Sequence, residues 1–387
     1  MICRRQRKST IREVHPHCGK VSKKRDSWVR CSNQKAILLR QPLPRRASPF
    51  QENESLAILP QLRWDAPPLW ERSRKKEVGR MSTYRFALTI GIFALTDFWF
   101  QTAQANDVFD VPVNHGQRQI ILKPSVHWPN GQGPFSIVVV VNSSAGASDV
   151  FLREPHLILN KANIAVAYLD TFSPRGIGMT GQDQTQVSST EMALDAYRVA
   201  EALRRNPRVK PDKIALFGHS KGGITALHAA TKAWQTLNAP SMKPFDASVA
   251  LAPSCELQFR EPELVTPLRV FLAEKDDLTL PTPCIRLFER MKSARQSVTY
   301  EVVRGAIHSW STRGYKFDPT LYSARKCANS PLYYSSKGFV SSVDGSLISF
   351  RDGIARCESR GALIGGDGDK REYVLKQASA WLKKQGW

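Results

Sequence analysis

The stretch that decides the fold reads KIALFGHSKGG and covers residues 213–223. Its first part, 213–217, has the apolar composition of a short buried strand, and the alanine-rich segment 223–236 predicts a helix. Gly218 and Gly222 allow the two elements to approach each other without Cβ clashes. The stretch therefore predicts a strand, a sharp turn and a helix, with the hydroxyl of Ser220 pointing out of the sheet edge.

The turn fits the pattern G-x-S-x-G, in which a serine on a strained strand-to-helix turn acts as a nucleophile. The alternative interpretation is an ordinary serine at a helix start, whose hydroxyl caps free N–H groups. Only the first interpretation requires an acid and a base later in the chain, in the order serine, Asp or Glu, then His.

Both partners follow in that order. The apolar strand predicted at 268–273 runs into two neighbouring acids, Asp276 and Asp277, and the strand predicted at 298–303 precedes His308. His308 would take the proton of the serine and return it to the leaving group, while a buried carboxylate would orient the imidazole. We expect Asp276 to be this carboxylate, with Asp277 as the alternative.

A tetrahedral intermediate also needs backbone donors for its negative charge. One comes from the residue after the nucleophile, here Lys221. The second comes from the loop after an early strand. Residues 137–141 are nearly all β-branched, as in a strand buried on both faces, and Ser144 follows on the next loop. We therefore expect the N–H groups of Lys221 and Ser144 to form the oxyanion hole.

From about residue 134 to 385 the chain resembles the dienelactone hydrolase family of α/β-hydrolases. The resemblance rests on four segments: GHSKGG at 218–223, LDTFSPRG at 169–176, AEKDDLTLP at 273–281 and GAIH at 305–308. It implies hydrolysis of a carboxylic ester, a lactone or a similar acyl compound. Founding members of the family have cysteine at the nucleophile position, where this chain has Ser220, so the dienelactone substrate is not carried over.

Two regions are candidates for contact with substrate. Arg175 lies on a loop that would border the pocket, where its guanidinium would hold a carboxylate through paired hydrogen bonds. The alternative is an arginine that ties down its own loop. Residues 309–369 are long for a connecting loop and predict a cap at the pocket mouth, or else a surface elaboration pinned by a disulfide. Its candidate substrate-facing aromatic residues are Trp310, Tyr315, Tyr333 and Tyr334.

Strands and helices alternate along the rest of the chain, which predicts the α/β class. We expect an α/β-hydrolase fold: a mostly parallel, doubly wound sheet with helices on both faces and a late insertion before the C-terminal helix. Besides the segments above, strands are predicted at 164–169 and 248–252, and helices at 150–161, 190–205, 283–295 and 370–385.

The positive charge is concentrated at the N-terminus. Residues 1–80 carry +13 of the formal net charge of +22, with scattered prolines and no apolar period, which predicts disorder. Residues 81–105 have a positive start, an apolar middle and an Ala-Gln-Ala site, the layout of a secretory signal peptide. Our hypothesis is that Met81 is the true start and that 106–387 is the exported hydrolase domain. The alternatives are an uncleaved anchor, a transit peptide or a basic nucleic-acid arm.

Export changes what the seven cysteines imply. Three precede the predicted mature domain, and the remaining four suggest two disulfides in an oxidising compartment. We predict Cys255 with Cys284, on loops of neighbouring core elements, and Cys327 with Cys357, within the late insertion. No metal-ligand spacing or phosphate loop occurs in the sequence, so neither a metal nor another cofactor is implied.

These features predict an exported, periplasmic or secreted serine hydrolase that acts on a small ester or lactone through an acyl-enzyme. An acyl peptidase or thioesterase on the same fold is the enzymatic alternative, since the triad is shared and the pocket decides specificity. A non-catalytic binding protein on a hydrolase scaffold is the other. We expect no nucleic-acid partner and no stable membrane insertion, and the oligomeric state stays open.

Overall fold

The computed structural model describes residues 18–23, 26–31, 107–115, 118–310, 314–335, 340–342, 344–366 and 368–387. The chain divides into two units, Met1–Ala94 and Leu95–Trp387. In the first unit, β1 (Cys18–Lys23) and β2 (Asp26–Cys31) pair antiparallel. The rest of 1–80 and the whole predicted signal peptide, 81–105, lie outside the described residues. None of the helices in the described ranges has the length and apolar composition of a membrane span.

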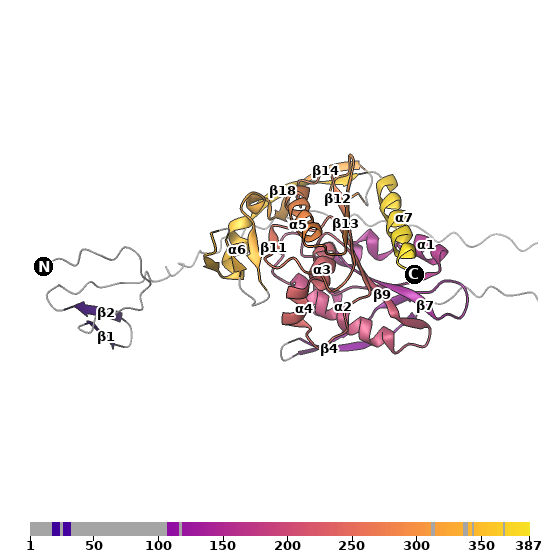
Figure 1. Cartoon of the computed structure of the whole chain (residues 1–387), viewed down its shortest axis with the longest axis horizontal. Coiled ribbons are helices and arrows are strands. Elements are labelled where there is room, and N and C mark those ends of the chain that lie inside the picture. The colour runs from indigo at the N-terminus through magenta and orange to yellow at the C-terminus, as the bar shows by residue number, and fades with distance from the viewer. Residues whose placement is uncertain are drawn as a thin grey trace, which may run out of the picture. The chain divides into compact units, whose positions relative to one another are not determined.

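The second unit is built on an eight-stranded sheet in the order β13-β12-β10-β9-β7-β8-β6-β3 (Figure 1). Adjacent strands from β13 to β8 are parallel, whereas β6 pairs antiparallel with both β8 and β3. This order and these directions confirm the predicted α/β-hydrolase fold class. The strands are β3 (Asp107–Val108), β6 (Ser125–His127), β7 (Phe135–Val141), β8 (Ile164–Leu169), β9 (Val209–His219), β10 (Ala247–Leu251), β12 (Leu268–Ala273) and β13 (Val298–Val303).

Helices cover both faces of the sheet. Alternate residues of β7 show the layering, because Val139 and Val141 belong to one core cluster and Val138 and Val140 to the other. All seven residues of β7 are buried, as expected for a parallel strand between two helical layers. The first layer contains α2 (Ser189–Arg204), α3 (Lys221–Ala230) and α5 (Pro281–Ser293), and the second contains α1 (His156–Leu159) and α7 (Gly368–Lys384).

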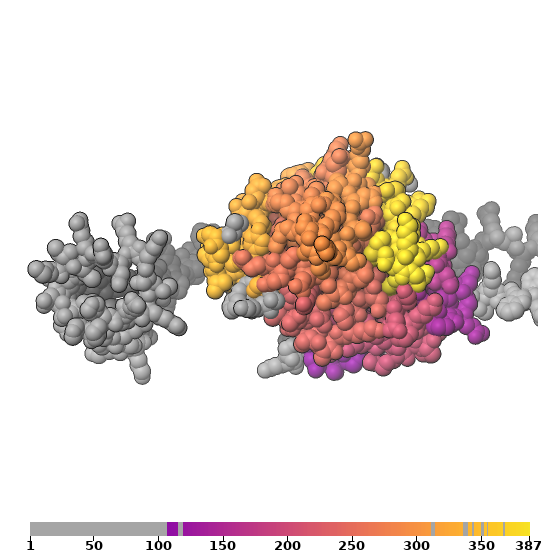
Figure 2. All heavy atoms as spheres, viewed as in Figure 1, coloured from indigo at the N-terminus to yellow at the C-terminus, as the bar shows by residue number. Residues whose placement is uncertain are grey.

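The C-terminal helix closes the second layer. Figure 2 shows α7, in yellow, lying against the magenta segment around α1. Arg371 Nε is 2.6 Å from the carboxylate of Glu154, which joins α7 to the residues just before α1. The C-terminal helix predicted at 370–385 is therefore present and packs on the sheet.

The strand order creates a switch point beside β7. The chain leaves β7 for β8 on one side and later returns to β9 on the other, so the segments after β7 and β9 diverge at the carboxyl end of the sheet. Such a point is where open α/β sheets form their ligand crevice. The two segments are close together here, since a Cβ on Gly222 would lie 2.8 Å from the carbonyl oxygens of Val141 and Asn142.

Two predicted helices are broken. The segment 150–161 forms η2 (Val150–Leu152), the single turn α1 and η3 (Asn160–Ala162), because Pro155 starts a new turn and cannot continue the one before it. The helix predicted at 223–236 is split into α3 and α4 (Lys232–Asn238). Between them Thr231 has an extended backbone and forms an isolated bridge with Leu264.

The late insertion has more regular structure than the loop-like cap that we expected. Its longest strand, β14 (Gly314–Ser323), pairs antiparallel with β18 (Ser359–Gly366). A small second sheet joins β11 (Leu257–Phe259) to three strands of the insertion. The remaining elements are η5 (Arg325–Cys327), β15 (Leu332–Tyr334), β16 (Val340–Ser341), β17 (Leu347–Ile348) and α6 (Phe350–Cys357).

Both predicted disulfides are present. Cys255–Cys284 joins the segment after β10 to α5, and Cys327–Cys357 joins η5 to α6 inside the insertion. A hairpin that the sequence did not predict, β4 (Val111–His115) with β5 (Arg118–Leu122), precedes the central strands and adds to the first core cluster.

Candidate active site

The turn between β9 and α3 has the geometry that the sequence motif requires. Ser220 is a non-glycine residue with φ 55° and ψ −117°, a conformation that costs free energy unless the surroundings enforce it. Gly218 is needed for the close crossing, because a Cβ there would lie 2.1 Å from the carbonyl oxygen of Gly222. The backbone N–H of Ser220 donates to Leu251 O at 2.8 Å, which ties the turn to the end of β10.

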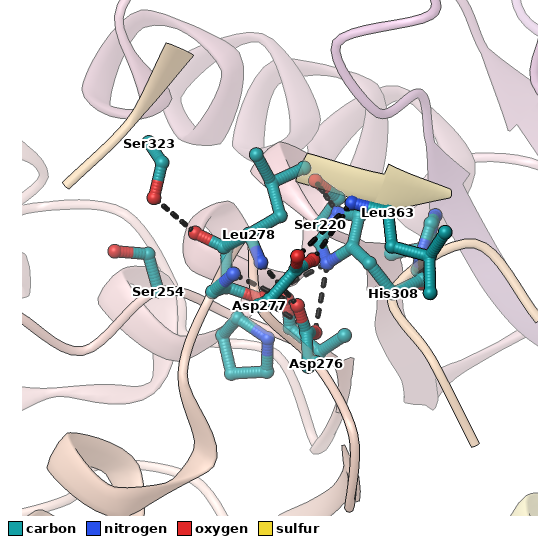
Figure 3. A network of polar contacts seen from close by, with 12 residues as sticks. Ser220, Ser254, Asp276, Asp277, Leu278, His308, Ser323 and Leu363 are labelled. Carbon is teal, nitrogen blue, oxygen red and sulfur yellow. Dashed lines mark hydrogen bonds and ion pairs between the residues drawn. The ribbon is translucent and has the colours of Figure 1, made fainter. Parts of the chain in front are cut away.

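Three predicted residues meet at this turn. Ser220 Oγ lies 2.8 Å from His308 Nε2, and His308 Nδ1 lies 2.8 Å from Asp276 Oδ2 (Figure 3). They follow the carboxyl ends of β9, β13 and β12, which parallel strands bring to one edge of the sheet. His308 and Asp276 are buried, and the serine is 9% exposed. The arrangement is that of a nucleophile, a general base and an orienting acid.

The structure distinguishes the two neighbouring acids. Asp276 Oδ1 accepts the N–H groups of Leu278 and Thr279 at 3.0 and 2.8 Å, which fixes its carboxylate toward His308. Asp277 instead accepts the N–H of Leu363 from the insertion (Figure 3). Asp276 is therefore the acid in contact with the imidazole, as the sequence led us to expect.

Thr279 and His219 were not predicted to assist the site. Thr279 Oγ1 lies 2.8 Å from Asp276 Oδ2 and 3.0 Å from His308 Nδ1. His219 Nε2 donates to the backbone carbonyl of His308 at 2.9 Å. Burial lowers the pKa of His219 to about 4, so its ring is neutral at neutral pH and carries its proton on Nε2. Its place directly before the nucleophile was the available sequence signal.

The two predicted oxyanion donors lie on the segments that follow β9 and β7, the two strands at the switch point. Lys221 is the first residue of α3, where a backbone N–H has no partner within the helix. On the loop after β7, the N–H of Ser143 donates to Asp149 Oδ2 at 2.8 Å and that of Ala145 to Ser143 Oγ at 3.2 Å. Among the described residues, the N–H of Ser144 between them has no hydrogen-bond partner.

Arg175 does not have the predicted role in binding substrate. Its guanidinium pairs with the Asp195 carboxylate at 2.7 and 3.2 Å and donates to Thr171 O at 2.6 Å. The side chains of Arg175 and Asp195 are only 7% and 5% exposed. A buried guanidinium needs such acceptors, so this arginine ties its own loop to α2, which was the alternative interpretation.

Of the predicted aromatic contacts, that of Trp310 is corrected. Trp310 is 0% exposed and packs in the second core cluster, because the chain turns inward after His308. Tyr315 is 63% exposed on β14. Tyr333 stacks against the guanidinium groups of Arg260 and Arg290, and Tyr334 packs edge-on against Phe259. Within the described part of the chain, no group of three or more His, Cys, Asp or Glu side chains could hold a metal ion.

Comparison of the sequence with known protein families and with curated proteins finds no match. Solved structures of similar fold include Thermogutta terrifontis esterase 2 at 16% identity and a TM-score of 0.43, over 53% of this chain and 85% of that one. A proposed dienelactone hydrolase from Klebsiella pneumoniae is 14% identical, with a TM-score of 0.42 over 54% and 89% of the two chains. MGS-M1, an α/β-hydrolase from a deep-sea metagenome library, is 18% identical, with a TM-score of 0.40 over 54% and 85%. At these values the likeness concerns the fold alone.

Proposed function

We propose that the protein is a serine hydrolase that cleaves a carboxylic ester or lactone through an acyl-enzyme. The observation that carries the proposal is the continuous contact from Ser220 Oγ through His308 to Asp276, at 2.8 Å for each step. A serine that merely caps a helix needs neither partner. The side chain of Ser220 makes no cap hydrogen bond to α3, which also speaks against that interpretation.

The geometry supports the following steps. His308 Nε2 takes the proton of Ser220 Oγ as that oxygen attacks the acyl carbon. The N–H groups of Lys221 and Ser144 bind the oxyanion of the tetrahedral intermediate. When the intermediate collapses, the C–O bond to the leaving alcohol breaks and His308 gives the alcohol its proton. Water, deprotonated by His308, then attacks the acyl-enzyme. The bond between the acyl carbon and Ser220 Oγ breaks, His308 returns the proton to Oγ, and the acid is released.

Asp276 acts through the imidazole. Its carboxylate accepts a hydrogen bond from the N–H at Nδ1 of His308, which keeps Nε2 free to accept from the serine. The imidazolium that forms during attack lies beside this carboxylate and is stabilised by it. The alternatives named above share these steps: an acyl peptidase or a thioesterase differs in the leaving group, an amine or a thiol.

We also propose that the hydrolase unit is exported. The two disulfides support this proposal, because disulfides persist in oxidising compartments and are rare in the cytosol. The check is mass spectrometry of the native protein. Peptides that begin near Asn106, with none from before Met81, are expected; peptides from 1–80 would contradict cleavage at that site.

The test of the enzymatic function compares the full chain with Ser220→Ala and with Ser293→Ala, an exposed serine at the end of α5. The substrates are p-nitrophenyl acetate and butyrate. We expect Ser220→Ala to lower kcat by about 10³-fold or more, and the control to retain full activity. A fluorophosphonate probe should label the wild type and not Ser220→Ala. Background hydrolysis by the wild type, with no labelling, would instead support a binding protein on this scaffold.

A further inference from the structure

Ser144, the predicted second oxyanion donor, is held by side chains and backbone of a distant loop. Residues 176–188 form this loop, without helix or strand, between η4 (Ser173–Arg175) and α2. Thr180 donates its N–H to Ser144 O at 2.8 Å. The amide of Gln184 contacts the Ser144 hydroxyl, with Oε1 at 3.1 Å and Nε2 at 3.0 Å. Ser144 is thus held by hydrogen bonds at its carbonyl oxygen and at its hydroxyl, and these bonds fix the residue that carries the N–H.

The side chain of the other predicted donor reaches the same loop. Lys221 Nζ donates to Gln184 O at 3.0 Å and lies 3.3 Å from Thr180 Oγ1. This ammonium is buried, and a buried charge is costly unless it is paired and hydrogen-bonded. Asp183 and Glu191 are the acids whose charges oppose that cost. The lysine therefore holds the loop at the same two residues that hold Ser144.

The contacts form a closed circuit between the two donors. It runs from Lys221 to Gln184, from Gln184 to Ser144, and from Ser144 through Thr180 back to Lys221. Regular secondary structure cannot fix the distance between the donors on the Ser144 side, because Ser144 itself lies on a loop. Hydrogen bonds to neighbouring segments must do so, and an oxyanion hole is sensitive to small misplacements of its donors.

The late insertion supports this loop from outside. Tyr322 donates its N–H to Gly181 O at 3.0 Å, and Gln182 Nε2 donates to Thr320 Oγ1 at 3.1 Å. Arg360 donates to Gln182 O at 2.6 Å. The loop is therefore packed between the β14–β18 ladder and the residues around the nucleophile.

We propose that Gln184 is a positioning residue for the oxyanion hole. It fixes the Ser144 hydroxyl and thereby the backbone N–H of Ser144, and Lys221 fixes Gln184 in turn. This inference rests on the proposed hydrolase function. It assigns to the loop 176–188 a role in stabilising the tetrahedral intermediate rather than in binding the ground-state ester.

The experiment measures kcat and KM for p-nitrophenyl butyrate with the full chain and four variants. Gln184→Leu removes both amide contacts, Ser144→Ala removes the hydroxyl from the other side, and Ser144→Thr restores a hydroxyl. Gln119→Leu, an exposed glutamine on the β4–β5 hairpin, is the matched control. We expect Gln184→Leu and Ser144→Ala each to lower kcat about 10- to 100-fold, with KM changed by less than about 3-fold. Ser144→Thr should recover part of the kcat that Ser144→Ala loses, and the control Gln119→Leu should stay near the wild type.

The double variant Gln184→Leu/Ser144→Ala provides the sharper readout. If the glutamine acts through the serine, the double variant is no slower than the worse single variant. Multiplied effects, or a kcat for Ser144→Ala within about 2-fold of the wild type, would overturn the inference. Ser144→Ala changes no residue of the loop 176–188. It therefore tests whether the contact between Ser144 and Gln184 affects kcat, even if Gln184→Leu fails to fold. A wild type that neither hydrolyses esters nor reacts with the probe defeats the proposed function itself. An active wild type with unaffected variants defeats only this inference.

Discussion

The carboxylate of Asp277 accepts the backbone N–H of Leu363, with its two oxygens 2.9 and 3.1 Å from the nitrogen. Leu363 lies on β18, so Asp277, the acid next to Asp276, anchors the late insertion. Two further contacts join the same regions: Arg325 donates to Asp277 O at 2.8 Å, and Ser323 Oγ donates to Leu278 O at 2.7 Å (Figure 3). In this loop Asp276 thus contacts the imidazole of His308, and the next residue, Asp277, contacts the insertion.

Exchanging each of these acids for its amide should separate the two roles. Asp276→Asn is expected to lower kcat by about 10⁴-fold, because an amide does not hold His308 in the tautomer that accepts the serine proton. Asp277→Asn should retain most activity and lose about 1 kcal/mol in the free energy of unfolding, from its weakened hydrogen bond to Leu363. Ester hydrolysis and urea denaturation of both variants check this. The reverse pattern would assign the triad to Asp277.

Two glycines differ in how closely other atoms surround them. A methyl group at Gly218 would lie 2.1 Å from the carbonyl oxygen of Gly222, whereas one at Gly178 would meet nothing within 4 Å. We expect Gly218→Ala to lower the free energy of unfolding by about 3 kcal/mol or more, since backbone must move. Gly178→Ala should change it by less than about 0.5 kcal/mol. Urea denaturation midpoints measure both, and equal effects would contradict the close crossing at the elbow.

Stability should depend on pH through Lys221. Burial lowers the pKa of its ammonium to about 8, from 10.5. Between these values the unfolded chain holds a proton that the folded chain has lost, so the free energy of unfolding rises with pH. Lys221→Met should lack this rise, while Lys232→Met, at an exposed ammonium, should keep it. Urea denaturation at pH 7.5, 9 and 10.5 tests the expectation. If the free energy of unfolding rises equally with pH in the wild type and in Lys221→Met, the expectation is refuted.

Loss of the disulfide inside the insertion should open the region around it more than loss of the disulfide in the core would. Cys327–Cys357 spans 30 residues and belongs to a small apolar cluster of four buried residues within the described part of the insertion. Cys255–Cys284, over 29 residues, belongs to the large first core cluster. Loop-closure entropy alone assigns each bond about 3 to 4 kcal/mol. Among the sites after residue 106, we expect trypsin to cut the Cys327→Ser/Cys357→Ser variant first within 314–366. First cleavage elsewhere in 106–387 would show that the insertion does not depend on this bond.

Much of the site followed from the sequence, because its residues stand at the ends of strands that local pattern reveals. Ser220, Asp276 and His308 each come after an apolar run, and the parallel sheet brings such ends together. Arg175 and Trp310 were misjudged for a different reason. Both stand outside the strands and helices that the sequence predicts, where composition does not say whether a side chain points outward or inward, and each is buried in the folded structure.

By itself, the sequence determined the order of the central parallel strands, the elbow at Ser220 and the chain order of its acid and base, because these depend on periodicity and on glycine at the crossing. Only the tertiary structure decided that Asp276 rather than Asp277 faces His308, that Arg175 is paired with Asp195, and that Gln184 joins Ser144 to Lys221. Such contacts join residues 20 to 40 positions apart, through side-chain directions that are set when the loops pack. Local pattern carries no information about those directions.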